Sequence, residues 1–387
     1  MCRSRAADAR RARPLLRLGV GDACQDEPMI GKPGVDSADI IRHVRDAYGL
    51  HIVCVGRLAL GADADAATFR LATDGDAYFL KLRRGATGGD RTTWLQSYLA
   101  GAEPGAGVGV GVGTRSGAAR VIAPLPDRDG RLCTALDGYV ASLYPFVEGR
   151  SGFEVRLTPD QWSELGTSVR ALHELRPPTA LRSSIRVETY GSEWRDKVRH
   201  YLAPDAAERL PDVPERLSDA PARELAAILK ARRQQLSTIV ERAEQLAAVL
   251  RGRDQELVLC HGDLHAGNVM AADDGSLVVV DWDDPVLAPR ERDLMFVGGG
   301  VGGVWNEPAE SAAFYRGYGT VEIDARTLAY YRCERIVQDI AEYCDELLLG
   351  APHGGDDREL SLRRFAGQFE PDNVVDIAER TYAALRG

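Results

Sequence analysis

The pattern of hydrophobic and polar residues divides the chain in two near residue 145. In the first part, the apolar residues fall in short runs separated by turn residues, which is typical of β-strands. The runs with this pattern are 51–60, 67–72, 77–82, 120–123 and 138–144. Asp74 and Gly75 separate the second run from the third and favour a tight hairpin. Helical periodicity at 36–48 and 92–99 completes a small, strand-rich unit.

After residue 149, apolar residues recur every three or four positions, which is the period of an amphipathic helix. Helices are expected at 159–175, 189–201, 221–250, 325–349 and 371–385, with short strands at 257–259, 268–271 and 277–281. The segment 145–149 breaks both patterns and indicates a hinge. We therefore expect an α+β protein. Its small N-terminal lobe, at 29–144, contains an antiparallel sheet, and its larger, mainly helical C-terminal lobe spans 150–387.

Residues 1–28 are rich in arginine and follow neither period. We expect this segment to be disordered, or to be a non-native extension in front of a start at Met29. The net charge of −10 argues against nucleic acid or an anionic membrane as a partner and suits a cationic ligand. No stretch approaches the roughly 20 apolar residues of a membrane-spanning helix, and no signal peptide is evident. A cytoplasmic protein is expected, and its oligomeric state is not indicated.

The candidate chemistry centres on the turn His261-Gly-Asp263-Leu-His265-Ala-Gly-Asn268, which follows an apolar strand. A second apolar strand, at 277–280, leads back to Asp281. A hairpin of this length returns Asp281 to Asn268, so that a carboxylate and an amide oxygen can bind Mg²⁺ together. Asp263 lies across the turn, where it can accept the proton of an attacking hydroxyl. This spacing is found in protein-kinase-like phosphotransferases. A solvated loop is the alternative, and both histidines are expected to be structural.

A nucleotide site is indicated by residues of the first part. Lys81 is one of only four lysines among 48 basic residues, and it lies on the third strand, where kinases carry the lysine that contacts the ATP phosphates. Its acidic partner is not evident, and an exposed edge-strand lysine is the alternative. Gly61 allows the loop between the first two strands to approach the phosphates. At the hinge, Tyr144, Phe146 and Val147 are expected to contact adenine, although a simple linker is an equal alternative.

The segment after Asp281 is rich in acidic residues and glycine. Asp283 and Asp284 lie close enough to the expected metal site to bind the ammonium groups of an acceptor. Trp305 could cover a ring or a cation of that acceptor, and Asn306 follows it in the chain. Internal ion pairs are the alternative role for the acidic residues of this segment.

The sequence HGDLHAGN, the strand after it and the position of Asp281 resemble the aminoglycoside phosphotransferases and their relatives, the choline, homoserine and methylthioribose kinases. The segments 281–306, 314–319 and 330–341 are similar, within that family, to the enzymes that phosphorylate the 9-hydroxyl of spectinomycin. The likeness extends from about residue 29 to the C-terminus.

The resemblance implies a protein-kinase-like fold of two lobes, ATP and Mg²⁺ as cofactors, and a small cationic aminocyclitol as substrate. By position, it implies Asp263 as the catalytic base, Asn268 and Asp281 as metal ligands, and Lys81 on the ATP phosphates. Glu334 joins the expected acceptor site. The expected activity is an antibiotic phosphorylation that gives resistance. A kinase for a metabolic amino alcohol or sugar is one alternative. A nucleotide-binding pseudokinase is the other, and the intact set of reaction-centre residues argues against it.

Overall fold

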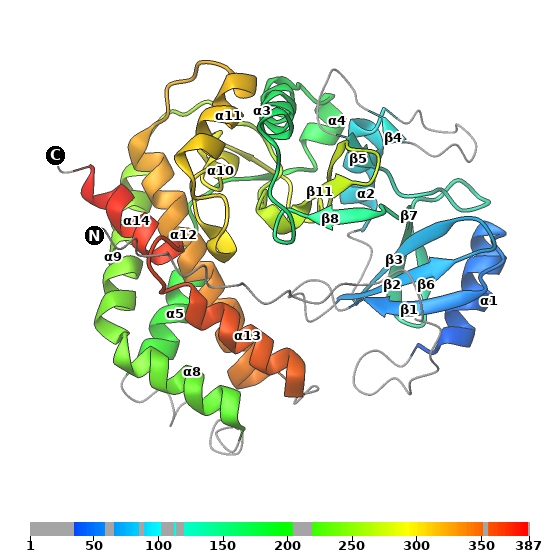
Figure 1. Cartoon of the computed structure of the whole chain (residues 1–387), viewed down its shortest axis with the longest axis horizontal. Helices are drawn as coiled ribbons and strands as arrows, with labels where there is room; N and C mark the ends of the chain where they lie inside the picture. The colour runs from blue at the N-terminus through cyan, green and yellow to red at the C-terminus, as the bar shows by residue number, and fades with distance from the viewer. Residues whose placement is uncertain are drawn as a thin grey trace, which may run out of the picture.

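The structure is a computed structural model that describes residues 35–58, 66–84, 89–101, 112–113, 120–203, 219–350 and 355–385. Figure 1 shows a strand-rich lobe at one end of the molecule and a larger helical lobe at the other. The last strand before the expected hinge ends at Pro145, and the hinge at 145–149 stays a prediction. The expectations for residues 1–28 and for Gly61 lie outside the described residues.

The N-terminal lobe is built on a five-stranded sheet in the order β1-β2-β3-β7-β6, in which all neighbours are antiparallel. Its strands are β1 (Cys54–Leu58), β2 (Ala66–Ala72), β3 (Ala77–Arg84), β6 (Thr134–Leu136) and β7 (Tyr139–Pro145). Leu80 and Leu82 of β3 are buried in the core of this lobe. Because successive side chains of a strand point to opposite faces, Lys81 between them points to the other face. The sheet thereby directs this lysine out of the core of its own lobe.

Helix α1 (Ser37–Tyr48) covers the core side of the sheet, at the outer edge of the lobe in Figure 1. The side chain of Asp36 accepts a hydrogen bond from the N–H of Asp39 and caps the first turn. The helix ends at Gly49, whose backbone is left-handed. Its apolar face buries Ile40 and Val44 completely.

A second five-stranded sheet, in the order β4-β5-β12-β11-β8, lies where the two lobes meet. Its strands are β4 (Val112–Gly113), β5 (Arg120–Ile122), β8 (Gly149–Ser151), β11 (Val269–Ala272) and β12 (Leu277–Val279). The sequence places β5 in the N-terminal lobe, whereas here it pairs in parallel with β12 of the catalytic hairpin. Alternation along a strand reveals its buried face but not its partner, so this pairing could not be predicted from the pattern.

In the C-terminal lobe, α3 (Pro159–Glu174) and α11 (Pro308–Tyr318) pack unusually close together. A Cβ atom added to Gly166 would lie 2.0 Å from the carbonyl oxygen of Phe314. One added to Gly317 would lie 1.8 Å from that of Ser163. The two glycines therefore permit backbone contact between the helices, and this contact supports the adjacent catalytic turn, because α3 also packs against β10 (Val258–Cys260).

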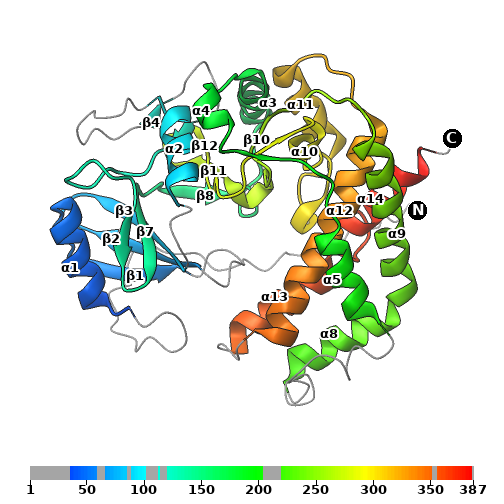
Figure 2. The ribbon, with the colours of Figure 1, turned by 180° about the vertical axis from the view of Figure 1, so that it is seen from behind.

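The central helix of the lobe, α12 (Ala325–Cys344), packs against α5 (Glu193–Leu202), α9 (Arg233–Arg251) and α14 (Val374–Ala383), as Figure 2 shows from behind. The single helix expected at 221–250 is two helices, α8 (Ala220–Ala231) and α9, which meet at Arg232. The end of the helix expected at 325–349 is a π-helical turn, η3 (Asp345–Leu349).

Short elements complete the described chain. They are α2 (Gly89–Leu99), α4 (Thr179–Arg182), β9 (Arg186–Val187), η1 (Ala266–Asn268), β13 (Val286–Ala288), α10 (Glu291–Leu294), η2 (Val301–Gly303) and α13 (Gly355–Gly367). Among the helices of the described residues, none combines the length and the apolar character needed to cross a membrane.

Candidate active site

Lys81 reaches from the N-terminal lobe to two carboxylates of the segment that follows β12. Its Nζ lies 2.9 Å from Oδ1 of Asp281 and 2.5 Å from Oδ2 of Asp283. Burial alone would lower the pKa of Lys81, but the two carboxylates outweigh burial and raise it. The side chain is therefore a cation. This geometry supplies the acidic partners of Lys81 that the sequence left open.

Helix α2, where kinases carry the partner of this lysine, presents an amide near the site. Oε1 of Gln96 accepts a hydrogen bond of 3.0 Å from the hydroxyl of Tyr144, at the end of β7. Burial raises the pKa of Tyr144, so its hydroxyl remains protonated and can donate. The hydrogen bond links α2 to the beginning of the hinge.

The backbone of the catalytic turn is held by a fully buried carboxylate on α10. The two oxygens of Asp293 accept hydrogen bonds of 2.9 Å from the N–H groups of His261 and Gly262. Nε2 of His173 donates to the same carboxylate at 3.1 Å. Burial alone would raise the pKa of Asp293, but these donors hold it below its usual range. Asp293 is thus an ionised anchor for the catalytic turn.

His261 ties the two halves of the catalytic hairpin together. Its Nδ1 accepts a hydrogen bond from the N–H of Asp263 at 3.2 Å, so the proton lies on Nε2, which donates to the carbonyl oxygen of Val280 at 3.0 Å. The ring is completely buried. Because both ring nitrogens are engaged with backbone groups, His261 is a structural residue, as the sequence suggested.

Gly262 is required by the close approach of two segments. Its φ of 88° lies in the left-handed region, and an added Cβ would lie 2.3 Å from the carbonyl oxygen of Asp284. Any side chain at this position would push Asp284 away from the turn. The glycine therefore keeps the segment 281–284 against the catalytic loop.

Asp263 is held at both carboxylate oxygens. Its Oδ1 lies 2.5 Å from Nη1 of Arg335 on α12, and its Oδ2 lies 3.4 Å from Nδ2 of Asn268 and from Nε2 of His265. Burial alone would raise the pKa of Asp263, but Arg335 and His265 outweigh it and hold the pKa well below the usual range. Asp263 is therefore a carboxylate at neutral pH, able to accept a hydrogen bond from a hydroxyl.

The residues expected to bind Mg²⁺ present suitable oxygens. The amide nitrogen of Asn268 donates to the carbonyl oxygen of Asp263 at 2.8 Å, which turns the amide oxygen away from that contact. The N–H of Val280 donates to the carbonyl oxygen of Asn268 at 3.0 Å and brings the following residue, Asp281, to the same edge. The carboxylate of Asp281 is 43% exposed. An amide oxygen and an accessible carboxylate fit a magnesium ion that keeps several positions for water and phosphate.

The hinge residues lie between β7 and β8. The N–H of Phe146 donates to the carbonyl oxygen of Ala77 at 3.0 Å, and the guanidinium of Arg70 lies 5.0 Å from the centre of the Phe146 ring. Tyr144 and Val147 are partly buried on either side of it. The backbone of Phe146 is thereby tied to the N-terminal sheet, and an adenine contact at these residues stays a prediction.

The residues expected to bind the acceptor are not gathered in one place. Asp283 and Asp284 lie beside Lys81 and the catalytic turn. Trp305 is only 5% exposed and packs edge-on against Trp162, with the ring centres 4.8 Å apart. The amide of Asn306 donates to the carbonyl oxygen of Asp372, in front of α14. Trp305 thus lies in the hydrophobic core of the C-terminal lobe.

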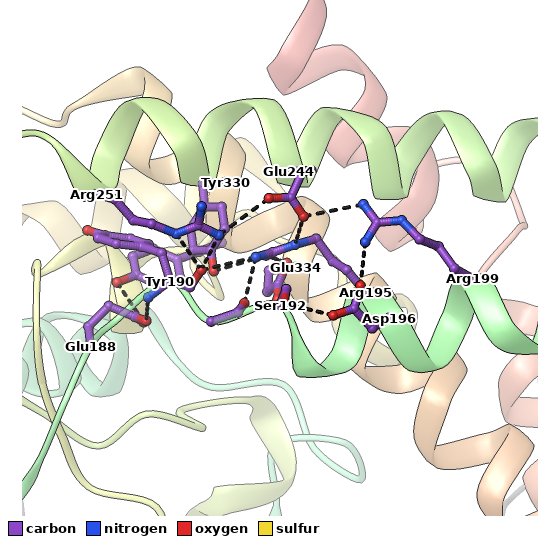
Figure 3. A network of polar contacts seen from close by, with 12 residues as sticks. Glu188, Tyr190, Ser192, Arg195, Asp196, Arg199, Glu244, Arg251, Tyr330 and Glu334 are labelled. Atoms are coloured by element: carbon purple, nitrogen blue, oxygen red, sulfur yellow. Dashed lines mark hydrogen bonds and ion pairs between the residues drawn. The ribbon is translucent and has the colours of Figure 1, made fainter.

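Glu334 belongs to a different site, the polar network of Figure 3. Its Oε2 lies 2.6 Å from Nη1 of Arg195, whose side chain is completely buried between α5, α9 and α12. Arg195 also contacts Glu244 at 3.0 Å and donates to the carbonyl oxygen of Gly191. Glu334 therefore points to α5, whereas Arg335, the next residue on α12, points to Asp263. The contact near the reaction centre is made by the neighbour of the residue that the sequence suggested.

Residues 57–332 match the model of a family described as the phosphotransferase enzyme family. The chain belongs to this family. Spectinomycin phosphotransferase APH(9)-Ia, solved with ADP and spectinomycin, is 31% identical and covers 90% of this chain and 99% of its own, with a TM-score of 0.75. Protein StrN of Streptomyces griseus is 26% identical over 261 residues, which are 67% of this chain and 74% of that protein. Amicoumacin kinase hAmiN, at 16% identity and a TM-score of 0.57, shares the fold alone; the alignment covers 89% of this chain and 94% of that one.

The family and its nucleotide-bound relatives confirm the predicted enzyme class and fold. This member of the family is an ATP-dependent phosphotransferase that acts on hydroxyl groups. Its antiparallel N-terminal sheet and helical C-terminal lobe are those of the kinase-like aminoglycoside phosphotransferases, as predicted.

Proposed function

We propose that this phosphotransferase transfers the γ-phosphoryl group of ATP to an aminocyclitol antibiotic, at the 9-hydroxyl of spectinomycin. The observation that carries the proposal is the 31% identity to spectinomycin phosphotransferase, which extends over 90% of this chain and 99% of the other. A second argument is charge. Asp263, Asp283 and Asp284 put three acidic residues in and beside the catalytic turn, and these suit an acceptor whose amines are protonated.

The proposed consequence is resistance. Phosphorylation adds roughly 1.5 to 2 negative charges at pH 7. These charges would repel the drug from an anionic ribosomal target in the cytoplasm. The reaction therefore converts a cationic ligand of RNA into one that binds RNA poorly.

Each residue of the site has a separate task in the proposed reaction. Asn268 and Asp281 would hold Mg²⁺, which when bound neutralises charge on the ATP phosphates. Lys81 binds the phosphates, and it is prepared for this role by its ion pairs with Asp281 and Asp283. The hinge at Tyr144, Phe146 and Val147 receives adenine.

Asp263 acts on the acceptor. Its carboxylate accepts the hydrogen bond of the attacking hydroxyl, orients the oxygen toward the γ-phosphorus and receives the proton as the new bond forms. The backbone N–H groups of the turn donate hydrogen bonds to Asp293, and His261 donates one to Val280. These hydrogen bonds hold the Asp263 carboxylate at a fixed position relative to the metal ligands. Most of the rate enhancement would come from this positioning.

A panel of acceptors tests the proposal. The protein is incubated with ATP, Mg²⁺ and one of spectinomycin, kanamycin or choline, and the products are identified by mass spectrometry. We expect a single added phosphoryl group on spectinomycin, and none when Asp263→Asn replaces the wild type. Phosphorylation of choline but not of spectinomycin would assign the enzyme to metabolism. Binding of ATP without turnover of any acceptor would indicate a pseudokinase.

A further inference from the structure

Arg335 of α12 contacts the carboxylate of Asp263, although 72 positions separate the two residues in the sequence. The distance from Nη1 to Oδ1 is 2.5 Å, and Nε of the same guanidinium lies 2.7 Å from Oδ1 of Asp339, one helical turn further on. Only 13% of the Arg335 side chain is exposed, and its guanidinium lies 5.8 Å from the centre of the Phe296 ring. Contacts other than that with Asp263 thus also hold the arginine in place.

A second arginine of the same helix shows what a purely structural role looks like. Arg332 donates to the carbonyl oxygens of Val297 and Gly298, at 3.1 Å each, and to the hydroxyl of Thr381. It therefore joins α12 to backbone and to α14. The guanidinium of Arg335 instead pairs with two carboxylates, one of which is the reactive group of the catalytic turn. A buried arginine that needed only a counter-ion already has Asp339.

The two oxygens of Asp263 have different surroundings. The contact of Oδ1 with Arg335 is short, whereas those of Oδ2 with Asn268 and His265 are 3.4 Å long. The carboxylate group is planar. A guanidinium that fixes Oδ1 in that plane therefore also fixes the direction in which Oδ2 presents its lone pairs. Oδ2 is then the oxygen that can exchange its long contacts for a shorter hydrogen bond from a hydroxyl.

We propose that Arg335 is a positioning residue for phosphoryl transfer, which holds Oδ1 of Asp263 so that Oδ2 faces the acceptor hydroxyl. The inference rests on the proposed role of Asp263 as the residue that orients that hydroxyl. In the transfer, the acceptor oxygen forms a bond to the γ-phosphorus while the bond from that phosphorus to the β,γ-bridging oxygen breaks. The bridging oxygen leaves with its electron pair on ADP, and the hydroxyl proton passes to Oδ2. Arg335 takes no part in the bonds that change. The family match ends at residue 332, before this arginine.

Arginine replacement with chemical rescue tests the role. Arg335→Ala is expected to lower kcat about 100-fold, the cost of misplacing a reacting group, with KM for ATP within about twofold of the wild type because the phosphate contacts are untouched. Added guanidinium ion, at millimolar concentrations that do not unfold the protein, should restore part of kcat by occupying the vacated site. The kcat of Arg335→Lys should lie between those of the wild type and Arg335→Ala, since an ammonium keeps the charge but not the paired geometry.

A matched control comes from Arg358 of α13. Its guanidinium is similarly shielded, with 7% of the side chain exposed, and pairs with Asp219 at 2.7 Å. It also donates to the carbonyl oxygens of Glu346 and Leu347 on η3, and none of these partners belongs to the catalytic turn. Arg358→Ala should lower the melting temperature without lowering kcat of the folded enzyme, and guanidinium should not raise kcat. The proposal would be overturned if both variants lost kcat equally, in proportion to the fall in melting temperature, and guanidinium restored kcat in neither. Arg335 would then have only a structural role. An Arg335→Ala enzyme with kcat within twofold of the wild type would also overturn the proposal.

Failure of the proposed acceptor can be told apart from failure of this inference. If the wild type does not phosphorylate spectinomycin, the acceptor assignment is wrong, and the same variants are compared on the slow hydrolysis of ATP, where water replaces the hydroxyl. If Arg335→Ala hydrolyses ATP more slowly and guanidinium restores the rate, the positioning role is still supported. If the hydrolysis rate does not fall, or guanidinium does not restore it, the positioning role is contradicted. If Arg335→Ala does not fold, Arg335→Lys and Asp339→Asn provide the comparison. The asparagine loosens the grip on Arg335 and should lower kcat in the same direction as the lysine.

Discussion

Nζ of Lys81 lies 2.5 Å from Oδ2 of Asp283, so a lysine of the N-terminal sheet is paired across the lobes with a carboxylate that follows the catalytic hairpin. We predict that Asp283→Asn lowers kcat/KM for ATP about tenfold, or about 1.4 kcal/mol, because a charge-assisted hydrogen bond that holds Lys81 is lost. Lys81→Ala should lower kcat/KM for ATP about 100-fold or more, since the cation itself is removed. Steady-state kinetics with varied ATP measures both effects.

Arg83 provides the control for that pair. It lies on the same strand and contacts Asp283 at 3.3 Å, but 49% of its side chain is exposed. An exposed ion pair contributes little, so Arg83→Ala should change kcat/KM by less than about twofold. If Asp283→Asn has no larger effect than Arg83→Ala, Asp283 does not orient Lys81.

Asp293 should control both the stability of the fold and the geometry of the turn. An asparagine in its place can accept only one of the two backbone hydrogen bonds now made by His261 and Gly262. We predict that Asp293→Asn lowers the free energy of unfolding by about 1–3 kcal/mol at pH 7 and reduces kcat. Chemical denaturation and steady-state kinetics measure the two effects, and a variant as stable and as active as the wild type would contradict this role.

The same pair of proteins gives a prediction for pH. The pKa of Asp293 is lower in the folded protein than its usual value, so the stabilisation is complete above the unfolded-state pKa of about 3.9 and is lost as the pH falls through the folded-state value. The stability difference between wild type and Asp293→Asn should therefore be constant from about pH 5 to pH 8 and shrink below about pH 4. A difference that grows on acidification would contradict the assignment of Asp293 as an ionised anchor.

Trp305 should behave as a core residue. Its ring is buried against Trp162, so Trp305→Ala should destabilise the protein by about 3–5 kcal/mol. Trp305→Phe should recover most of that loss and leave KM for the acceptor unchanged. Thermal unfolding and acceptor kinetics decide between the two roles, because a Phe variant with normal stability and a raised acceptor KM would place the ring in the acceptor site.

Glu334 should likewise affect stability more than substrate binding. Its removal leaves the fully buried Arg195 with one carboxylate fewer, and we predict a cost of about 3 kcal/mol for Glu334→Ala. Both KM values should stay within about twofold of the wild type. A folded, stable variant that binds the acceptor poorly would return Glu334 to the acceptor site.

The parts of the molecule that could be predicted from the sequence are those set by local spacing. The catalytic turn, its hairpin and the strand that carries Lys81 follow from short-range alternation and from a motif whose spacing brings Asn268 and Asp281 together. The contacts that were missed join distant segments. Arg335 contacts Asp263 only because the fold brings α12 beside the catalytic turn. Similarly, β5 joins the catalytic hairpin by a parallel pairing with β12. Local periodicity specifies neither.

Burial explains the two expectations that the structure places elsewhere. An aromatic residue near acidic residues and an acid on a helix suggest a ligand site when only the sequence is considered. Trp305 lies in a glycine-rich segment without regular periodicity, and Glu334 is one step along the helix from the face that meets Asp263. A rotation of about 100° per residue separates neighbouring side chains of a helix, so the segment could be identified from sequence but not the residue that faces the site.

The central claim is that Asp263 directs ATP-dependent phosphorylation of the spectinomycin 9-hydroxyl. The most direct test measures spectinomycin-dependent release of ADP by wild type and Asp263→Asn, with NMR of the product to locate the phosphoryl group. We predict turnover by the wild type, a phosphate on the 9-oxygen, and a loss of about 100-fold or more in kcat for the variant. Equal turnover by the two proteins, or a phosphate on another oxygen, would contradict the account.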